Sequence, residues 1–318
     1  VSVPSMRPPL FPVDPTCTVE PLNVLPSLKR EWERFVVIGA GKTGMDAVLE
    51  LLRQRVDPER ITWVVSRDPW VMMRDNLWPA RILETLAEQG RAIVRSRNWR
   101  DLFGGFEDIG LLARIWPERE PECFRCATVS GEEVAQLRRV QSVVRMGHLQ
   151  RIEAERIVLE RGELPTGPHV LHVDCTAQGL PTWAPRPIFE PNRITLQSVL
   201  FCQPTASAAL VAAAEIGLSS DETRNAALQS TLPPERPEDL LTVLPTLYDN
   251  GRACMRHGAL RRFFFRNRLA LTSHMSGWQV FVAILRALWW LPQVESNVRR
   301  IAASMPPRAL QAPGTRIN

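Results

Sequence analysis

Three glycines are spaced so that they could hold the pyrophosphate of a dinucleotide. Gly39, Gly41 and Gly44 follow a G-x-G-x-x-G pattern directly after the apolar residues 35–38. In a strand–turn–helix of this kind, the first glycine permits a sharp exit from the strand and the second lets the pyrophosphate approach the backbone. The third lets the helix pack close to the strand. The helix would present unpaired N–H groups and the positive end of its dipole to the phosphates.

The residues around this turn predict the elements that would position it. Residues 35–38 are apolar and largely β-branched, which favours a strand. Residues 45–52 place apolar side chains at a period of about 3.6 residues, which indicates a helix. A second apolar stretch, residues 61–65, follows where a βαβ unit needs its next strand. The alternative to nucleotide binding is a βα turn with a purely structural role.

The end of the second predicted strand bears on which nucleotide would bind. An acidic residue at that place usually accepts the ribose 2′-OH of NAD, whereas arginine accommodates the 2′-phosphate of NADP. Here Ser66 and Arg67 come first, and Asp68 follows one residue late. We therefore predict NADP(H), with NAD(H) as the alternative that Asp68 leaves open and a solvated loop cation as the structural alternative for Arg67. The nucleotide-binding residues expected here are Gly39, Ala40, Gly41, Lys42, Thr43, Gly44, Asp46, Ser66, Arg67 and Arg74.

Composition and charge narrow the class of protein. The chain has 318 residues, of which 45% are hydrophobic and 23% charged, as in ordinary globular domains. Its formal net charge of +5 is spread along the chain. This charge suits an anionic cofactor, and the absence of a compact basic block argues against a nucleic-acid partner. The longest apolar run contains Arg286 and is too short for a membrane span, so we expect no membrane partner and a cytoplasmic location.

The six cysteines and five histidines give no metal-binding pattern. Only Cys123 and Cys126 have a suggestive C-x-x-C spacing, and a zinc site would need a second pair of ligands at short spacing. We expect buried or half-buried thiols and no metal site. No catalytic residue is identified from the sequence.

Further along the chain the pattern predicts both strands and helices. Residues 101–116 indicate a helix, and Ser130 with Glu133 forms a helix-start signature. Residues 143–158 alternate like antiparallel strands inserted between parallel ones. Residues 171–179 indicate another buried strand, which ends in small residues that include Thr176 and Ala177. The end of such a strand is where α/β folds place ligand contacts. Residues 193–200 indicate another strand.

The C-terminal part is predicted to be helical. A helix is expected over residues 202–215, and its first turn, with Gln203, Pro204 and Thr205, is a second candidate anion site. The alternative is a buried packing helix rich in alanine. From residue 221 onward the apolar stretches have helical spacing.

Several segments together resemble bacterial FAD/NAD(P)-binding oxidoreductases, a class that includes flavin monooxygenases and pyridine nucleotide-disulfide oxidoreductases. The resemblance covers residues 1 to about 215 and is weaker in the C-terminal helices. The matching segments are residues 39–46, 63–70, 124–128, 171–177, 193–198 and 202–209.

The resemblance implies a substrate of small-molecule size and a reaction in which NADPH passes hydride to flavin. It places residues 174–177, which include Thr176 and Ala177, at the return toward a flavin domain. It places residues 203–207, which include Gln203, Pro204 and Thr205, near the flavin. The class carries an earlier glycine-rich turn for FAD and a signature of authentic monooxygenases, and neither stands ahead of Gly39 in this sequence. We therefore expect FAD to depend on a segment that precedes residue 1.

The expected fold is α/β, with a Rossmann-like NAD(P)-binding domain, inserted antiparallel strands, a remnant of an FAD domain and C-terminal helices. The expected domains are a linker at 1–30, the NAD(P)-binding domain at 31–180, a return segment at 181–220 and a helical region at 221–318. The predicted function is an NADPH-dependent flavoprotein oxidoreductase. A non-catalytic NADP(H)-binding module is the main alternative, and a Rossmann-type methyltransferase is disfavoured by the phosphate-directed glycine pattern.

Overall fold

A computed structural model describes residues 3–76, 82–177, 184–269 and 276–304. The chain divides into two compact units. The sheet unit contains residues up to Arg74 together with the segment that begins at Ala113 and includes the described residues to Ala177. The helical unit contains Asp75–Leu112 and the described residues from 184 onward. The predicted functional domains remain predictions, and residues 1–2, 77–81, 178–183, 270–275 and 305–318 of them lie outside the described chain.

A five-stranded parallel sheet forms the centre of the sheet unit. Its strands lie in the order β1-β11-β2-β3-β7, and every neighbouring pair is parallel. Their bounds are β1 Thr18–Pro21, β2 Arg34–Ile38, β3 Ile61–Val64, β7 Val143–Val144 and β11 Val170–Asp174. The sequence therefore predicted the mixed α/β class correctly, and this sheet with its helices is compatible with a Rossmann-like fold.

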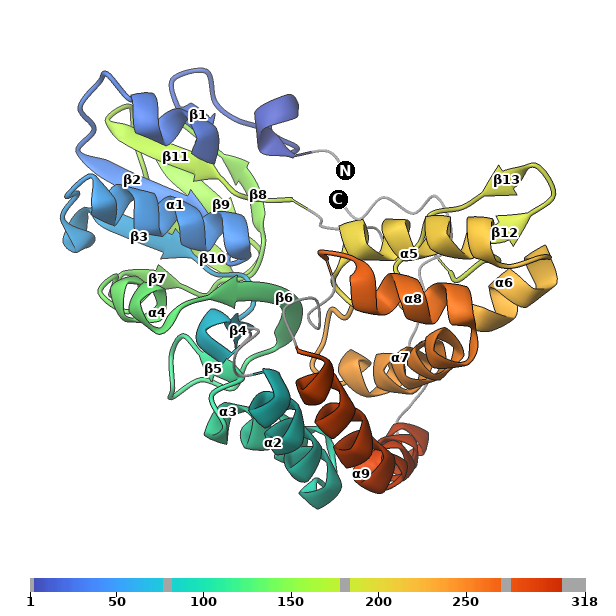
Figure 1. Cartoon of the computed structure of the whole chain (residues 1–318). Coiled ribbons are helices and arrows are strands. Elements are labelled where there is room, and N and C mark those ends of the chain that lie inside the picture. Colours follow the sequence, from blue (N-terminus) through green and yellow to red (C-terminus); the bar gives the residue numbers. More distant parts are fainter. Residues whose placement is uncertain (1–2, 77–81, 178–183, 270–275, 305–318) are drawn as a thin grey trace. The chain divides into compact units, whose positions relative to one another are not determined.

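Alternating side chains bury both faces of this sheet. On one face Val37 and Trp63 pack in a core with Met45, Val48 and Leu51 of helix α1, Lys42–Arg53. That helix lies across the sheet in Figure 1. On the other face the neighbouring strand residues pack against a three-stranded antiparallel sheet formed by β8 Leu149–Ile152, β9 Arg156–Leu159 and β10 Gly162–Pro165. Burial on both faces explains the nearly continuous apolar runs of the parallel strands.

A second group of strands extends the sheet unit. Strands β5 Leu112–Arg114, β4 Pro69–Met73 and β6 Cys123–Val129 lie in the order β5-β4-β6, and β4 is parallel to β6. Helix α4, Gly131–Leu137, follows β6 and begins with the predicted capping box of Ser130 and Glu133. The prediction that residues 143–158 are all antiparallel is wrong for β7. This strand follows a helix and joins β3 in parallel, whereas β8 and β9 are antiparallel as predicted.

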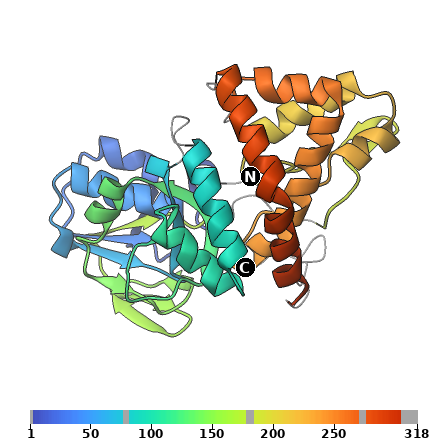
Figure 2. The same ribbon diagram turned by 60° about the horizontal axis from the view of Figure 1, so that its bottom comes forward.

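The helical unit is formed mainly by packed helices. Figure 2 shows α9, in red, running beside α2, in teal, and the two helices are in contact. The helices are α2 Ile82–Arg95, α3 Trp99–Asp108, α5 Pro204–Gly217, α6 Asp221–Ala227, α7 Asp239–Arg256, α8 Gly258–Arg266 and α9 Gly277–Ala303. Short 3₁₀ helices span Pro4–Met6, Leu22–Ser27, Pro58–Arg60 and Arg74–Asn76. Among the described residues, none of the helices is long and apolar enough to cross a membrane.

Two predicted elements are shorter than the sequence pattern indicated. Helix α3 ends at Asp108 rather than at residue 116, because Gly110 adopts a φ of 69° and closes the helix end. The strand predicted over 193–200 is limited to β13, Arg193–Ile194, which forms a hairpin with β12, Phe189–Glu190. Asn192 makes the turn with a φ of 64°. Residues 195–200, which continue the alternating pattern, pair with no strand of the described chain.

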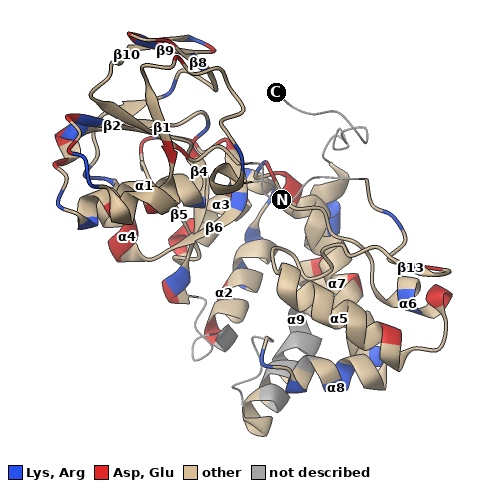
Figure 3. Ribbon diagram, turned by 90° about the horizontal axis from the view of Figure 1, so that it is seen from above, with Lys and Arg blue, Asp and Glu red and all other residues tan. Residues whose placement is uncertain are grey.

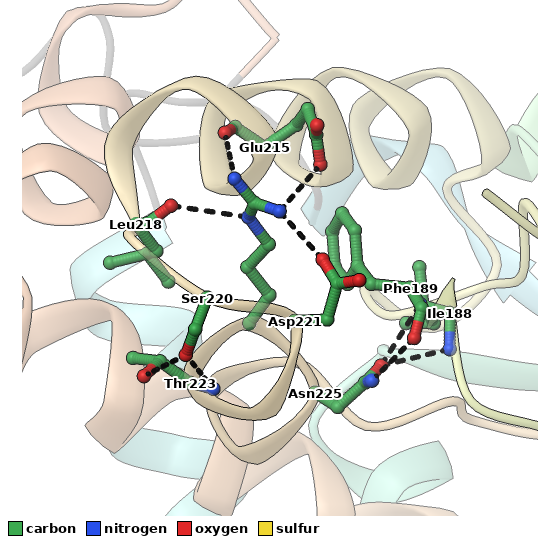
Figure 4. A network of polar contacts seen from close by, with 9 residues as sticks. Ile188, Phe189, Glu215, Leu218, Ser220, Asp221, Thr223 and Asn225 are labelled. Carbon is green, nitrogen blue, oxygen red and sulfur yellow. Dashed lines mark hydrogen bonds and ion pairs between the residues drawn. The ribbon is translucent and has the colours of Figure 1, made fainter. Parts of the chain in front are cut away.

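Arg224 stabilises the turn between α5 and α6 through several hydrogen bonds (Figure 4). The Arg224 guanidinium donates hydrogen bonds to the carbonyl oxygens of Leu218 at 3.2 Å and Glu215 at 2.8 Å, and to the Asp221 carboxylate at 2.6 Å. Asn225, the next residue, accepts hydrogen bonds from two backbone N–H groups at the start of β12. The turn and the hairpin are thereby held together within the helical unit.

Candidate functional site

The glycine-rich turn lies between β2 and α1 and is tightly built at its first glycine. Gly39 has a φ of 119°, which favours glycine, and its N–H donates to the carbonyl of Val64 at 3.0 Å. A Cβ at this position would lie 2.9 Å from the carbonyl oxygen of Cys175. The turn therefore requires glycine both for its backbone conformation and for its contact with the chain after β11.

Gly44 brings the helix against the strand end. A Cβ at Gly44 would lie 1.9 Å from the carbonyl oxygen of Gly39, a distance that no structure tolerates without moving the backbone. The indole Nε1 of Trp63, on β3, donates a hydrogen bond of 2.8 Å to the same oxygen. These two contacts fix the angle at which α1 leaves the sheet.

Gly41 differs from the other two glycines, because the space beside it is open. It is the N-cap of α1 and is exposed, and a Cβ built on it would meet no atom of the described chain within 4 Å. Its φ of −75° is ordinary for any residue. Among the described residues no side chain caps the helix, and the first turn of the helix contains no acidic residue. The helix N-terminus therefore has open space beside Gly41 and no side-chain acceptor in the part of the chain that the structure describes, as an anion site requires.

The turn lies where the order of strands reverses. The chain proceeds from β2 to β3 on one side, while β11 occupies the other side of β2. In open parallel sheets, ligands bind outside the carboxyl ends of the strands at such a switch point. Thr176 and Ala177, both half-buried, follow β11 directly at this edge. The structure thus brings the glycine turn and the predicted Thr176–Ala177 segment to one place.

A buried carboxylate organises the segment after β11. Asp174 is 2% exposed and accepts hydrogen bonds from the Thr176 N–H at 2.8 Å and hydroxyl at 2.6 Å. Arg7 approaches the same carboxylate at 3.7 Å and donates to the Thr176 carbonyl at 2.7 Å. The sequence placed Asp174 only in the segment that returns toward a flavin domain, and it did not indicate Arg7 as part of the site. Arg7 carries no local signal, because its partner lies 169 residues away.

The predicted ribose end of the site lies just after β3. Ser66 and Arg67 are both half-buried, and the Arg67 guanidinium has no hydrogen bond or ion pair to any part of the chain that the structure describes. Asp68, in contrast, is 7% exposed, and both of its oxygens accept from Nε of Arg145 at 3.0 Å. Arg145 also lies over the ring of Trp116, 4.4 Å from its centroid. Asp68 is thus engaged inside the protein.

Charged side chains cluster beside the first turn of α1. Lys42 forms an ion pair with Asp46 one turn later, and its ammonium also lies 4.0 Å from Glu133 at the start of α4. Arg74, after β4, lies 3.3 Å from the other oxygen of Glu133. Acidic residues colour the start of α4 red in Figure 3. The sequence predicted Lys42, Asp46 and Arg74 as site residues, but assigned Glu133 only to the helix cap.

The remaining predicted contacts belong to the helical unit. Gln203 is the N-cap of α5, and Pro204 and Thr205 begin that helix; all three are exposed. No side chain in the described ranges caps this helix either. Their placement near a flavin remains a prediction.

The four cysteines that the structure describes as free are buried or half-buried thiols. Cys123, Cys175 and Cys254 are buried, and Cys17 is half-buried, as predicted for these four. Burial raises the pKa of Cys175 far above its usual range, and the nearby carboxylates of Asp174 and Asp46 raise it further. The thiol beside the glycine turn is therefore protonated and a poor nucleophile. No group of three potential metal ligands occurs within the described ranges.

Comparison with models of known protein families gives no match. The chain is 43% identical over 228 residues to uncharacterized proteins of Mycobacterium bovis (strain ATCC BAA-935 / AF2122/97) and of Mycobacterium tuberculosis (strains CDC 1551 / Oshkosh and ATCC 25618 / H37Rv). The match covers 70% of this chain and 42% of each relative, so the chain spans less than half the length of these proteins.

Proposed function

We propose that the sheet unit binds NADP(H) across the carboxyl ends of β2 and β11. The observation that carries this proposal is Gly41, whose missing side chain leaves open space directly in front of an uncapped helix N-terminus. A pyrophosphate in that space would accept hydrogen bonds from the backbone of Lys42 and Thr43. Gly39, Ala40, Gly44 and Asp46 would hold the turn and the first turn of the helix in position.

The side chains after β3 favour NADP(H) over NAD(H). The Arg67 guanidinium has no ion-pair partner in the described chain, and a 2′-phosphate would supply one. Ser66 would add a neutral hydroxyl donor. Asp68, the acidic residue that could accept a ribose 2′-OH, already receives two hydrogen bonds from Arg145. Asp68, on which the NAD(H) alternative depended, is therefore already hydrogen-bonded within the protein.

We further propose that the whole protein is a flavin-dependent oxidoreductase acting on a small-molecule substrate. The resemblance in residues 39–46, 63–70 and 171–177 supports this. The reduced nucleotide would supply hydride, and this chain would bind and orient it. The sequence offers one glycine-rich βα turn, and that turn is assigned to the nicotinamide nucleotide. These residues do not fit the ADP part of FAD as well, so no flavin step is derived from this chain.

The experiment compares this chain with the longer mycobacterial relative. We expect the 318-residue chain to bind NADPH, to purify colourless and to oxidise no NADPH above background. We expect the relative to bind flavin and to oxidise NADPH. NADPH binding by both proteins with oxidation by neither, even after flavin is added, would favour a non-catalytic NADP(H)-binding module.

A further inference from the structure

Glu133 lies between two cations of the proposed nucleotide site. Its Oε1 is 4.0 Å from the ammonium of Lys42, and its Oε2 is 3.3 Å from the guanidinium of Arg74. Lys42 is the first residue of α1, and Arg74 directly follows β4. Three separate elements therefore bring a carboxylate and two cations together beside the uncapped helix N-terminus.

Glu133 is held in place by hydrogen bonds with Ser130. Oε2 of Glu133 accepts a hydrogen bond of 2.6 Å from the backbone N–H of Ser130, and the Ser130 hydroxyl accepts in return from the N–H of Glu133 at 3.2 Å. This capping box fixes Glu133 at the first turn of α4. The Lys42 and Arg74 side chains are longer and more exposed, at 36% and 47% against 26% for Glu133. An arriving anion can therefore draw the cations away while the carboxylate stays in place.

We infer that Glu133 is an exchangeable counter-ion that lowers the affinity of this site for phosphate and so sets the strength of nucleotide binding. This inference rests on the proposed function. In the free protein, Glu133 partly neutralises Arg74 and, together with the closer Asp46, Lys42. A bound nucleotide phosphate competes with it for the two cations and is repelled by its fixed negative charge. Each nucleotide-binding event therefore includes the loss of two ion pairs.

The test uses a substitution that removes the charge and keeps the cap. Glu133→Gln retains a side-chain oxygen for the Ser130 N–H, because glutamine also serves in capping boxes. Glu132→Gln is the matched control, since Glu132 is exposed, lies one residue away in the same first turn and has no ion pair in the described chain. Calorimetric titration measures the affinity for NADPH. Inorganic pyrophosphate is titrated separately as a probe of the phosphate site alone. Circular dichroism verifies that both variants are folded.

We expect Glu133→Gln to bind NADPH about three- to tenfold more tightly than wild type, the range for loss of two half-exposed ion pairs and one repulsion. Glu132→Gln should change the affinity by less than about twofold. Unchanged or weaker NADPH binding by folded Glu133→Gln would overturn the inference. If wild type binds no NADPH, the proposed function fails instead. In that case the pyrophosphate titration alone tests the counter-ion role of Glu133. Tighter pyrophosphate binding by Glu133→Gln supports this role, and equal binding overturns it.

Discussion

The indole N–H of Trp63 donates a hydrogen bond of 2.8 Å to the carbonyl oxygen of Gly39, joining β3 to the turn that follows β2. Trp63 is fully buried, and its ring lies 5.2 Å from that of Trp116. The same Gly39 oxygen would be 1.9 Å from a Cβ on Gly44. The Gly39 carbonyl thus leaves no room for a side chain on Gly44, and it accepts a hydrogen bond from a tryptophan on the neighbouring strand.

Trp63→Phe removes this hydrogen bond and keeps an aromatic ring in the core. We expect a loss of about 1–3 kcal/mol in the free energy of unfolding, because a buried carbonyl loses its donor and the smaller ring leaves space. Urea denaturation measures this loss. The turn should also loosen, so nucleotide affinity should fall. Trp116→Phe, which alters the neighbouring tilted ring but not the hydrogen bond, is the control. An equal loss of affinity in that variant would mean that the hydrogen bond has no particular role.

Gly41 and Gly44 should respond to substitution in opposite ways. Gly41→Val places its side chain in open space, so we expect a folded protein that binds no nucleotide, because the pyrophosphate and the side chain compete for one volume. Gly44→Ala drives a Cβ into the Gly39 carbonyl, so we expect a protein that folds poorly. Circular dichroism and nucleotide titration together separate the two effects. Retained nucleotide binding in Gly41→Val would show that the phosphate lies elsewhere.

The sequence predicted the parts of this site that depend on neighbouring residues. The strand, the three glycines and the start of α1 are contiguous, and the α4 cap depends on two residues three positions apart. The contacts between distant segments left no such pattern. Arg7 with Thr176 and Arg145 with Asp68 are pairs separated by 169 and 77 residues. Likewise, β7 has the alternation of an antiparallel strand, but its partner is decided by the helix before it.

A buried histidine should make the stability of the sheet unit depend on pH. His172 is fully buried on β11; its Nδ1 lies 2.9 Å from the Thr18 carbonyl and its Nε2 lies 2.7 Å from the Thr166 hydroxyl. The carbonyl accepts a hydrogen bond from Nδ1–H, so Nε2 of the neutral ring accepts a hydrogen bond from the Thr166 hydroxyl. Burial lowers the pKa of His172 below its usual 6.5. The unfolded chain therefore binds the proton more readily than the folded protein.

We expect the free energy of unfolding to be highest above about pH 6.5 and to fall as the pH drops through the unfolded pKa of histidine toward the lower folded one. Chemical denaturation at a series of pH values measures this. His172→Gln should be less stable at pH 8 and should lose part of the pH dependence. His169→Gln, an exposed position three residues earlier, should retain it. An unchanged pH profile in His172→Gln would assign the dependence to other groups.

The most direct measurement is a calorimetric titration of the folded chain with NADPH and with NADH, repeated on Arg67→Ala. The account predicts that wild type prefers NADPH, and that Arg67→Ala weakens NADPH by about 1–3 kcal/mol while NADH is little affected, because only the 2′-phosphate offers the charge-assisted hydrogen bond. Arg34→Ala, which removes an exposed arginine at the opposite end of β2, should change neither affinity. Absence of binding by either nucleotide would contradict the proposed site, and equal losses for both nucleotides in Arg67→Ala would contradict the NADP(H) assignment.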